Sequence, residues 1–144
     1  MMIIPDVNLL IFAHNRDAPD HQAAKQWLMD LMRSGKPVGM PWIVISGFIR
    51  ISTHPKLLKQ PIHVEDAIGI ARSWLARNNV RIIEPGSRFQ DLFFIGLEKL
   101  GTAGNLTTDA YLAAIAIEHQ AELQSCDTDF HRFAGLRWKN PLDP

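Results

Sequence analysis

Residues 3–14 have the sequence IIPDVNLLIFAH. A short apolar run ends at Asp6, and a second apolar segment of helical length follows it directly. A short apolar run that stops at a turn residue predicts a buried strand, so we expect a strand at residues 2–5 and a helix at residues 7–14. A strand followed at once by a helix is the beginning of a βα unit, from which parallel sheets are built.

The same alternation continues along the 144 residues of the chain. Further strands are predicted at residues 38–40, 80–83 and 123–126, with amphipathic or apolar segments between them. This order indicates one α/β domain over residues 1–144, with helices around a short, mostly parallel sheet. We expect these helices at residues 18–33, 42–53, 64–77, 88–100 (with Ser87 as N-cap) and from the N-cap Thr107 to about residue 119.

The composition excludes several classes of protein. With 47% hydrophobic and 21% charged residues, the chain is neither a disordered tail nor a coiled coil. No apolar run approaches the roughly 20 residues that span a bilayer, so we expect no membrane segment. Cys126 is the only cysteine, which excludes an internal disulfide and favours a reducing, cytoplasmic location. The net charge of zero carries no weight for or against binding of nucleic acid.

Four aspartates stand where predicted buried elements meet. Asp6 follows the first predicted strand, Asp109 begins a helix, and Asp127 and Asp129 follow the last predicted strand. Ligands of parallel sheets bind beyond the carboxyl ends of the strands. Carboxylates that gather there need a compensating cation, and oxygen ligands suit Mg²⁺ or Mn²⁺. Such ions support phosphodiester cleavage, so the pattern predicts a metal-dependent nuclease.

Each aspartate also has a purely structural interpretation. Asp6 can be a helix N-cap, Asp109 can interact with the helix dipole, and Asp127 can form an Asx-turn. The combination of three acids at three junctions favours a metal-binding site over three separate structural roles.

The remaining residue types indicate less chemistry. Six histidines show no metal-binding spacing, and Cys126 is interpreted as a small buried residue. Arg50 lies in an apolar helix beside the predicted site, where it can contact phosphate or pair with one of the acids. The tryptophans are expected to pack in the core: Trp27, Trp42, Trp74 and Trp138.

The stretches that contain these acids resemble the PIN-domain family, and within it the VapC toxins of toxin–antitoxin pairs. Residues 3–14 resemble its first motif, GNLTTDAYLAAIAIEHQAEL (104–123) its third and LQSCDTDFHRFAGLRWKNPL (123–142) its last. PWIVISGFIRIST (41–53) is similar to one branch of these toxins. The likeness spans nearly the whole chain, with the motifs in the family's order and spacing.

The resemblance implies a three-layer α/β/α fold and a Mg²⁺- or Mn²⁺-dependent endoribonuclease that hydrolyses structured RNA such as tRNA or rRNA. It also implies a homodimer and inhibition by a VapB-like antitoxin. Asp6, Asp109 and Asp127 fall on the family's metal-binding, catalytic acids, with Asp129 as an auxiliary ligand. An interface for the dimer can draw on the apolar residues Trp42, Ile43, Ile45, Phe48 and Ile49.

Further residues are expected to support these acids. Thr107 and Thr108 would cap the helix of Asp109, and Asn8 would orient Asp6.

One departure from the family concerns its usual glutamate after the second strand. No acid occurs between Asp30 and Glu65, and Ser46 stands near the expected position. Either Asp129 or a water held by Ser46 would compensate, and the number of metal ions, one or two, stays open. The missing acid supports an alternative, a PIN-like module that binds antitoxin or RNA without cleaving it.

A phosphohydrolase or a receiver domain also gathers aspartates at strand ends. The first requires Asp-x-Asp after the opening strand, where this chain has Asn8. The second requires an early acidic pair and a lysine after the last strand, and neither is present.

Overall fold

The computed structural model describes residues 1–143. Five short strands form one sheet in the order β3-β2-β1-β4-β5, and every neighbouring pair is parallel. The sequence predicted a mostly parallel sheet, and the sheet proves to be parallel throughout. The strands are β1 (Ile3–Pro5), β2 (Val38–Pro41), β3 (Val80–Ile83), β4 (Glu122–Gln124) and β5 (Arg137–Lys139).

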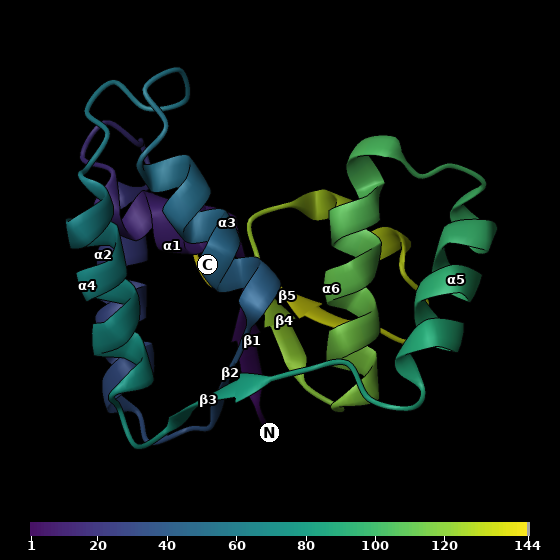
Figure 1. Ribbon diagram of the computed structural model, residues 1–144. Helices are drawn as coiled ribbons and strands as arrows, with labels where there is room; N and C mark the ends of the chain where they lie inside the picture. The colour runs from purple at the N-terminus through teal and green to yellow at the C-terminus, as the bar shows by residue number, and fades with distance from the viewer. Residues whose placement is uncertain (144) are drawn as a thin grey trace.

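Helices cover the sheet on both sides, which confirms the predicted three-layer arrangement. Figure 1 shows α1–α4 on one side of the strands and α5 with α6 on the other. Two 3₁₀ segments, η1 (Gly104–Leu106) and η2 (Thr128–Arg132), flank α6 and β4 along the chain. The α-helices are α1 (Val7–His14), α2 (His21–Arg33), α3 (Trp42–Ser52), α4 (Val64–Leu75), α5 (Phe89–Leu100) and α6 (Thr107–Glu118).

Several elements differ from the sequence-based prediction. The edge strand β5 was not predicted, because its three residues Arg-Trp-Lys offer no apolar run. Helix α2 begins at His21 and not at residue 18, after Pro19, which disfavours helical backbone in the residue before it. The prediction that Ser87 caps α5 is wrong, since the N-cap is Arg88 and no side chain caps this helix.

The chain order of the strands places a switch point at the middle of the sheet. From β1 the chain adds β2 and then β3 on one side, and it later adds β4 and β5 on the other. Such a reversal opens a crevice at the carboxyl ends of the two strands between which it occurs, here β1 and β4. Asp6 follows β1, and Asp127 comes shortly after β4, which is the fourth strand and not the last one, as the sequence suggested.

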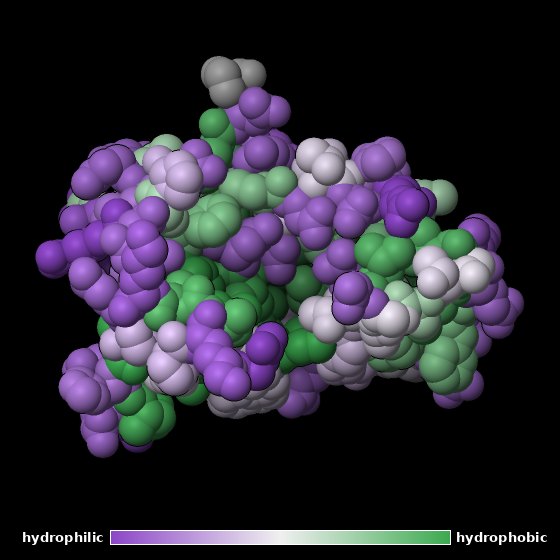
Figure 2. Space-filling model, turned by 90° about the horizontal axis from the view of Figure 1, so that it is seen from above, coloured by the Kyte–Doolittle hydropathy of each residue, from purple (hydrophilic) through white to green (hydrophobic). Residues whose placement is uncertain are grey.

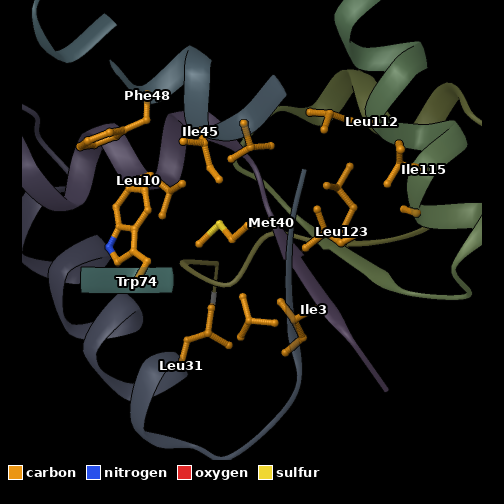
Figure 3. Close-up of a cluster of buried hydrophobic side chains, with 14 of the residues drawn as sticks. Ile3, Leu10, Leu31, Met40, Ile45, Phe48, Trp74, Leu112, Ile115 and Leu123 are labelled. Atoms are coloured by element: carbon orange, nitrogen blue, oxygen red, sulfur yellow. The ribbon is translucent and has the colours of Figure 1, made fainter. Parts of the chain in front are cut away.

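The hydrophobic core fills the space between the sheet and the helices (Figure 3). Phe48 and Trp74 contact each other edge to face, with ring centroids 4.7 Å apart. Three of the four tryptophans are buried or half-buried, but Trp42 is 54% exposed, so its predicted role in the core is wrong. It is the first residue of α3, at the helix end, where the core does not reach it.

Helices α1 and α3 approach each other closely at Gly47. A Cβ atom added there would lie 2.9 Å from Cγ2 of Val7, the residue after Asp6. The glycine therefore brings α3 close to the first turn of α1. Among residues 1–143, no helix is both long and apolar enough to cross a membrane.

Candidate metal centre

Asp6 begins the site at the carboxyl end of β1. It is the N-cap of α1, and its Oδ1 accepts a hydrogen bond of 2.7 Å from the Val7 amide. Its Oδ2 accepts one of 2.7 Å from the hydroxyl group of Ser125. The side chain is 9% exposed, and this burial raises the pKa of the carboxyl group, an effect that the two hydrogen bonds oppose. The N-cap role suggested by the sequence is thus present together with a place in the site.

Ser125 connects three parts of this site, and the sequence analysis missed it. Its fully buried hydroxyl group donates to Asp6, and its oxygen accepts from the Asp127 amide at 3.0 Å and from Nδ2 of Asn8 at 3.2 Å. The signal available in the sequence was a hydroxyl residue at the end of an apolar strand, two positions before Asp127. Asn8, predicted to orient Asp6, reaches it only through Ser125.

Asp109, Asp127 and Asp129 come together across the crevice. Each offers one carboxylate oxygen, and these oxygens all lie within 4.8 Å of one another. Asp109 comes from the first turn of α6, and the other two from the segment after β4. Oδ1 of Asp127 accepts a hydrogen bond from the Asp129 amide at 2.9 Å. The predicted Asx-turn is therefore present, and it fixes the positions of the two acids relative to each other.

Among the acids of the cluster, Asp109 has a strongly raised pKa. Burial, the largest cause, raises its pKa to about 7, and the neighbouring charges of Asp127, Asp6 and Asp129 contribute to this rise in that order. Asp6 therefore belongs to the same electrostatic cluster, although it is not among the acids that share the 4.8 Å limit. Four close carboxylates without a compensating cation repel one another.

Asn8 gives an independent test of whether a cation fits this place. Its Oδ1 is buried, and it accepts no hydrogen bond within the described residues. A buried acceptor without a donor costs free energy, and a metal ion or its bound water would satisfy it. The nearby cluster offers the carboxylate oxygens of Asp109, Asp127 and Asp129, which is the chemistry that Mg²⁺ and Mn²⁺ prefer. The residues present therefore fit a hard divalent cation.

The other predicted supporting residues do not contact the acids through hydrogen bonds. Thr107 is the first residue of α6 and not its N-cap, which is Leu106, and no side chain caps the helix. Thr108 follows it as an exposed residue of the first turn. The hydroxyl group of Ser46 is exposed and donates to the Ile43 carbonyl at 3.3 Å.

Arg50 is exposed in the last turn of α3. Of the two roles predicted for it, pairing with an acid of the cluster is not found among residues 1–143. The charges that shift the pKa values of Asp6 and Asp109 come only from other acids. Contact with a phosphate group stays a prediction.

A model of the PIN domain matches residues 3–136. The chain belongs to the PIN-domain family. Ribonuclease VapC33 of Mycobacterium tuberculosis is 44% identical over 141 residues, which cover 98% of this chain and 99% of that protein. Ribonuclease VapC37 of the same organism is 36% identical over 140 residues, or 97% of each chain. Within the PIN-domain family, this chain is therefore a VapC member.

A solved structure supports the fold independently of close sequence similarity. The crystal structure of VapBC2 from Rickettsia felis, bound to a DNA fragment from its promoter, contains a chain that matches with a TM-score of 0.68. The match covers 97% of this chain and 98% of that one at 19% identity. PIN-domain proteins thus keep this arrangement of strands and helices when most of their sequence has changed.

Proposed function

We propose that this chain is a divalent-metal-dependent endoribonuclease, the toxin of a VapBC-type toxin–antitoxin pair. The observation that carries the proposal is the cluster of Asp109, Asp127 and Asp129 at the switch point of the sheet. The names of its relatives, Ribonuclease VapC33 and VapC37, support the same activity. Hydrolysis of tRNA or rRNA would place the protein in the cytoplasm.

Asp109, Asp127 and Asp129 would hold the ion, Mg²⁺ or Mn²⁺, with Asp6 beside them. When bound, the ion would supply a water activated at neutral pH and charge compensation for the scissile phosphate. Asp6 fixes the start of α1 and, through Ser125, the backbone that carries Asp127. Each of its oxygens accepts one hydrogen bond and keeps a lone pair with which Asp6 would also bind the ion. The backbone N–H of Asp129 donates a hydrogen bond to Oδ1 of Asp127, which fixes the position of Asp129.

The same geometry disfavours a mechanism in which a side chain of the protein attacks the RNA phosphate directly. The hydroxyl proton of Ser125 is donated to Asp6, and its oxygen accepts two further hydrogen bonds. Burial raises the pKa of the Cys126 thiol to about 11, so the thiolate is scarce at neutral pH. Water is the nucleophile that these surroundings support, and no covalent intermediate with the enzyme is expected.

The absent glutamate favours a single principal ion. Ser46, near the place where the family carries that acid, directs its hydroxyl group to its own helix. Asp129 stands within the cluster and offers the compensating carboxylate. The alternative, a module that binds RNA or antitoxin without cleavage, has the same fold and differs only in turnover.

An antitoxin and a second copy of the chain are the partners we propose. The VapBC2 structure contains a VapC chain together with its VapB partner and promoter DNA, which supports a VapB-like antitoxin here. Seen from above, hydrophobic residues are exposed in the middle of the face, with hydrophilic residues around them (Figure 2). Such surface is often covered by another chain.

For the homodimer, the residues expected at an interface divide into two groups. Ile45 and Phe48 are 3% and 0% exposed, so they belong to the core and are not available. Trp42 is 54% exposed on α3, with Ile43 and Ile49 partly exposed on the same helix. Sedimentation should show a dimer for the wild-type protein and a monomer for Trp42→Glu; an unchanged dimer would exclude Trp42 from the interface.

The activity is tested by incubating the purified chain with tRNA and rRNA in Mg²⁺. Discrete cleavage products from the wild-type protein, absent for Asp127→Ala, are expected. Binding of these RNAs without products would support the non-catalytic alternative.

A further inference from the structure

A groove lies between α5 and α6 and is closed at its base by the residues that end η2. Its volume is about 250 Å³. Ala110, which lines it, directly follows Asp109, and Arg132 comes three residues after Asp129. The groove therefore lies close in sequence to two acids of the cluster, and it runs along the two helices, which lie side by side in Figure 1. We call it the α5–α6 groove.

Three cationic side chains line the α5–α6 groove: Arg88, Lys99 and Arg132. All three are exposed, and none of their charged groups has a hydrogen-bond or ion-pair partner among residues 1–143. Asp91 is the only acid that lines the groove. By contrast, Arg77 elsewhere in the chain donates through Nε to the Met32 carbonyl. Glu118 lies next to Arg88, since its carboxylate accepts a hydrogen bond of 2.9 Å from the Arg88 amide, so the excess of positive charge in the groove is greatest at Lys99 and Arg132.

The walls between these cations are apolar. On α6 the lining includes Ile117, which is partly exposed, whereas Ala110, Ala113 and Ala114 are each only 2% exposed and offer a ligand little surface. On α5 the wall includes Ile95, which is 47% exposed. Arg88 and Lys99 stand at opposite ends of α5, eleven residues apart, a separation of about 16 Å along the helix axis. The apolar surface within reach of a ligand is therefore chiefly that of Ile95 and Ile117, between cations at the two ends of α5.

We propose that the α5–α6 groove binds the RNA strand next to the scissile phosphate, with phosphates at Lys99, Arg132 and Arg88 and a base against Ile95. This inference rests on the proposed ribonuclease function and assigns that site its substrate-binding extension. Single-stranded RNA alternates charged phosphates with flat apolar base faces. The cations of the groove complement the phosphates, and Ile95 complements a base. The groove is also lined by residues close in sequence to acids that would hold the ion. An acidic peptide would match the charges but not the apolar wall.

The test measures binding in EDTA, so that it does not depend on cleavage. A short fluorescein-labelled oligouridine is titrated with the full chain, and its anisotropy gives the affinity at several salt concentrations. Lys99→Ala combined with Arg132→Ala should weaken binding on the order of tenfold. The slope of log K against log salt should become shallower by about 0.7 for each phosphate that the variant no longer neutralises, an effect that a merely structural role would not produce.

Matched variants make the outcome specific to the groove. Lys25→Ala combined with Arg33→Ala removes the same charges from exposed positions of α2 and should leave affinity and slope nearly unchanged. Lys99→Arg combined with Arg132→Lys should retain binding, and Ile95→Ser, which removes apolar surface without changing any charge, should weaken it. Equal decreases in affinity for the α2 and groove variants would overturn the proposal, because binding would then depend on overall charge alone.

A second titration, with a labelled oligoglutamate of equal charge, distinguishes RNA from an acidic peptide. If the groove variants lose affinity for the peptide and not for the RNA, the proposal is wrong. Cleavage of RNA by the wild-type protein in Mg²⁺ is recorded separately. An inactive chain whose groove variants lose RNA affinity would refute the ribonuclease function and leave the binding groove in place.

Discussion

The hydroxyl group of Ser125 donates a hydrogen bond of 2.7 Å to Oδ2 of Asp6, across 119 positions of the sequence. This bond joins the carboxyl ends of β1, the central strand of the sheet, and its neighbour β4. Through the Asp127 amide, the same serine also fixes the segment that carries two acids of the cluster. Ser125 therefore positions the site without being one of its metal ligands.

Replacing Ser125 by alanine should destabilise the protein and disturb the site. The amide of Asp127 and Nδ2 of Asn8 would lose their acceptor, which costs about 1–3 kcal/mol when such groups are buried. The pKa of Asp6 should rise further, because the hydrogen bond from Ser125 lowers it. Urea unfolding measures the first effect, and ¹³C NMR of the Asp6 carboxyl carbon against pH measures the second.

Ser73→Ala is the control, since the Ser73 hydroxyl group is exposed and donates only to the Ile70 carbonyl of its own helix. This variant should have nearly wild-type stability. If Ser125→Ala were equally stable, the proposed role of Ser125 in holding β1 and β4 together would be wrong.

The raised pKa of Asp109 makes the stability of the metal-free protein depend on pH. Its value is about 7, against 3.8 for an ordinary aspartate, so the folded state binds the proton more tightly than the unfolded chain. The free energy of unfolding should therefore fall as pH rises from about 4 to about 7. Asp109→Asn, which cannot ionise, should show a smaller fall between pH 5 and pH 8 in EDTA.

Asp17→Asn serves as the comparison, because it removes the same charge from an exposed loop residue. Its unfolding free energy should follow the wild-type pH dependence. A wild-type slope that Asp109→Asn leaves unaltered would show that Asp109 does not carry the electrostatic strain of the cluster.

Much of this fold follows from the sequence because apolar periodicity marks the buried elements. Apolar runs predict the first strand and the helix over residues 7–14, and the acids of the site follow directly after such runs. The edge strand β5 contains no apolar run, since its residues are polar or half-exposed, and it was therefore not predicted. Ser125 was missed for a related reason: its role depends on a partner 119 positions away, which local pattern does not indicate. Trp42 was misassigned because exposure at a helix end depends on packing and not on spacing.

Replacing Gly47 by alanine should destabilise the protein, although Gly47 lies inside a helix. Alanine in place of glycine usually stabilises a helix by up to about 1 kcal/mol. At Gly47 the added Cβ would lie 2.9 Å from Cγ2 of Val7, a β-branched residue with little rotamer freedom in a helix. Because overpacking costs about 1–3 kcal/mol, Gly47→Ala should have a net lower free energy of unfolding.

Gly69 offers the opposite case in α4. No atom lies within 4 Å of a Cβ built there, so Gly69→Ala should raise the melting temperature. Both variants are compared by thermal unfolding. A Gly47→Ala protein as stable as Gly69→Ala would mean that α1 and α3 are not held at this distance.

The central claim is that Asp109, Asp127 and Asp129 hold a divalent cation that RNA hydrolysis requires. The most direct measurement is the initial rate of cleavage of one labelled RNA by the wild-type protein and by Asp109→Asn, first in EDTA and then after Mg²⁺ or Mn²⁺ is added in excess. We predict no cleavage in EDTA, restored cleavage by the wild-type protein with either ion, and at most a trace with Asp109→Asn, whose fold is checked by circular dichroism. Equal cleavage in EDTA and in Mg²⁺, or full activity of Asp109→Asn, would contradict the account.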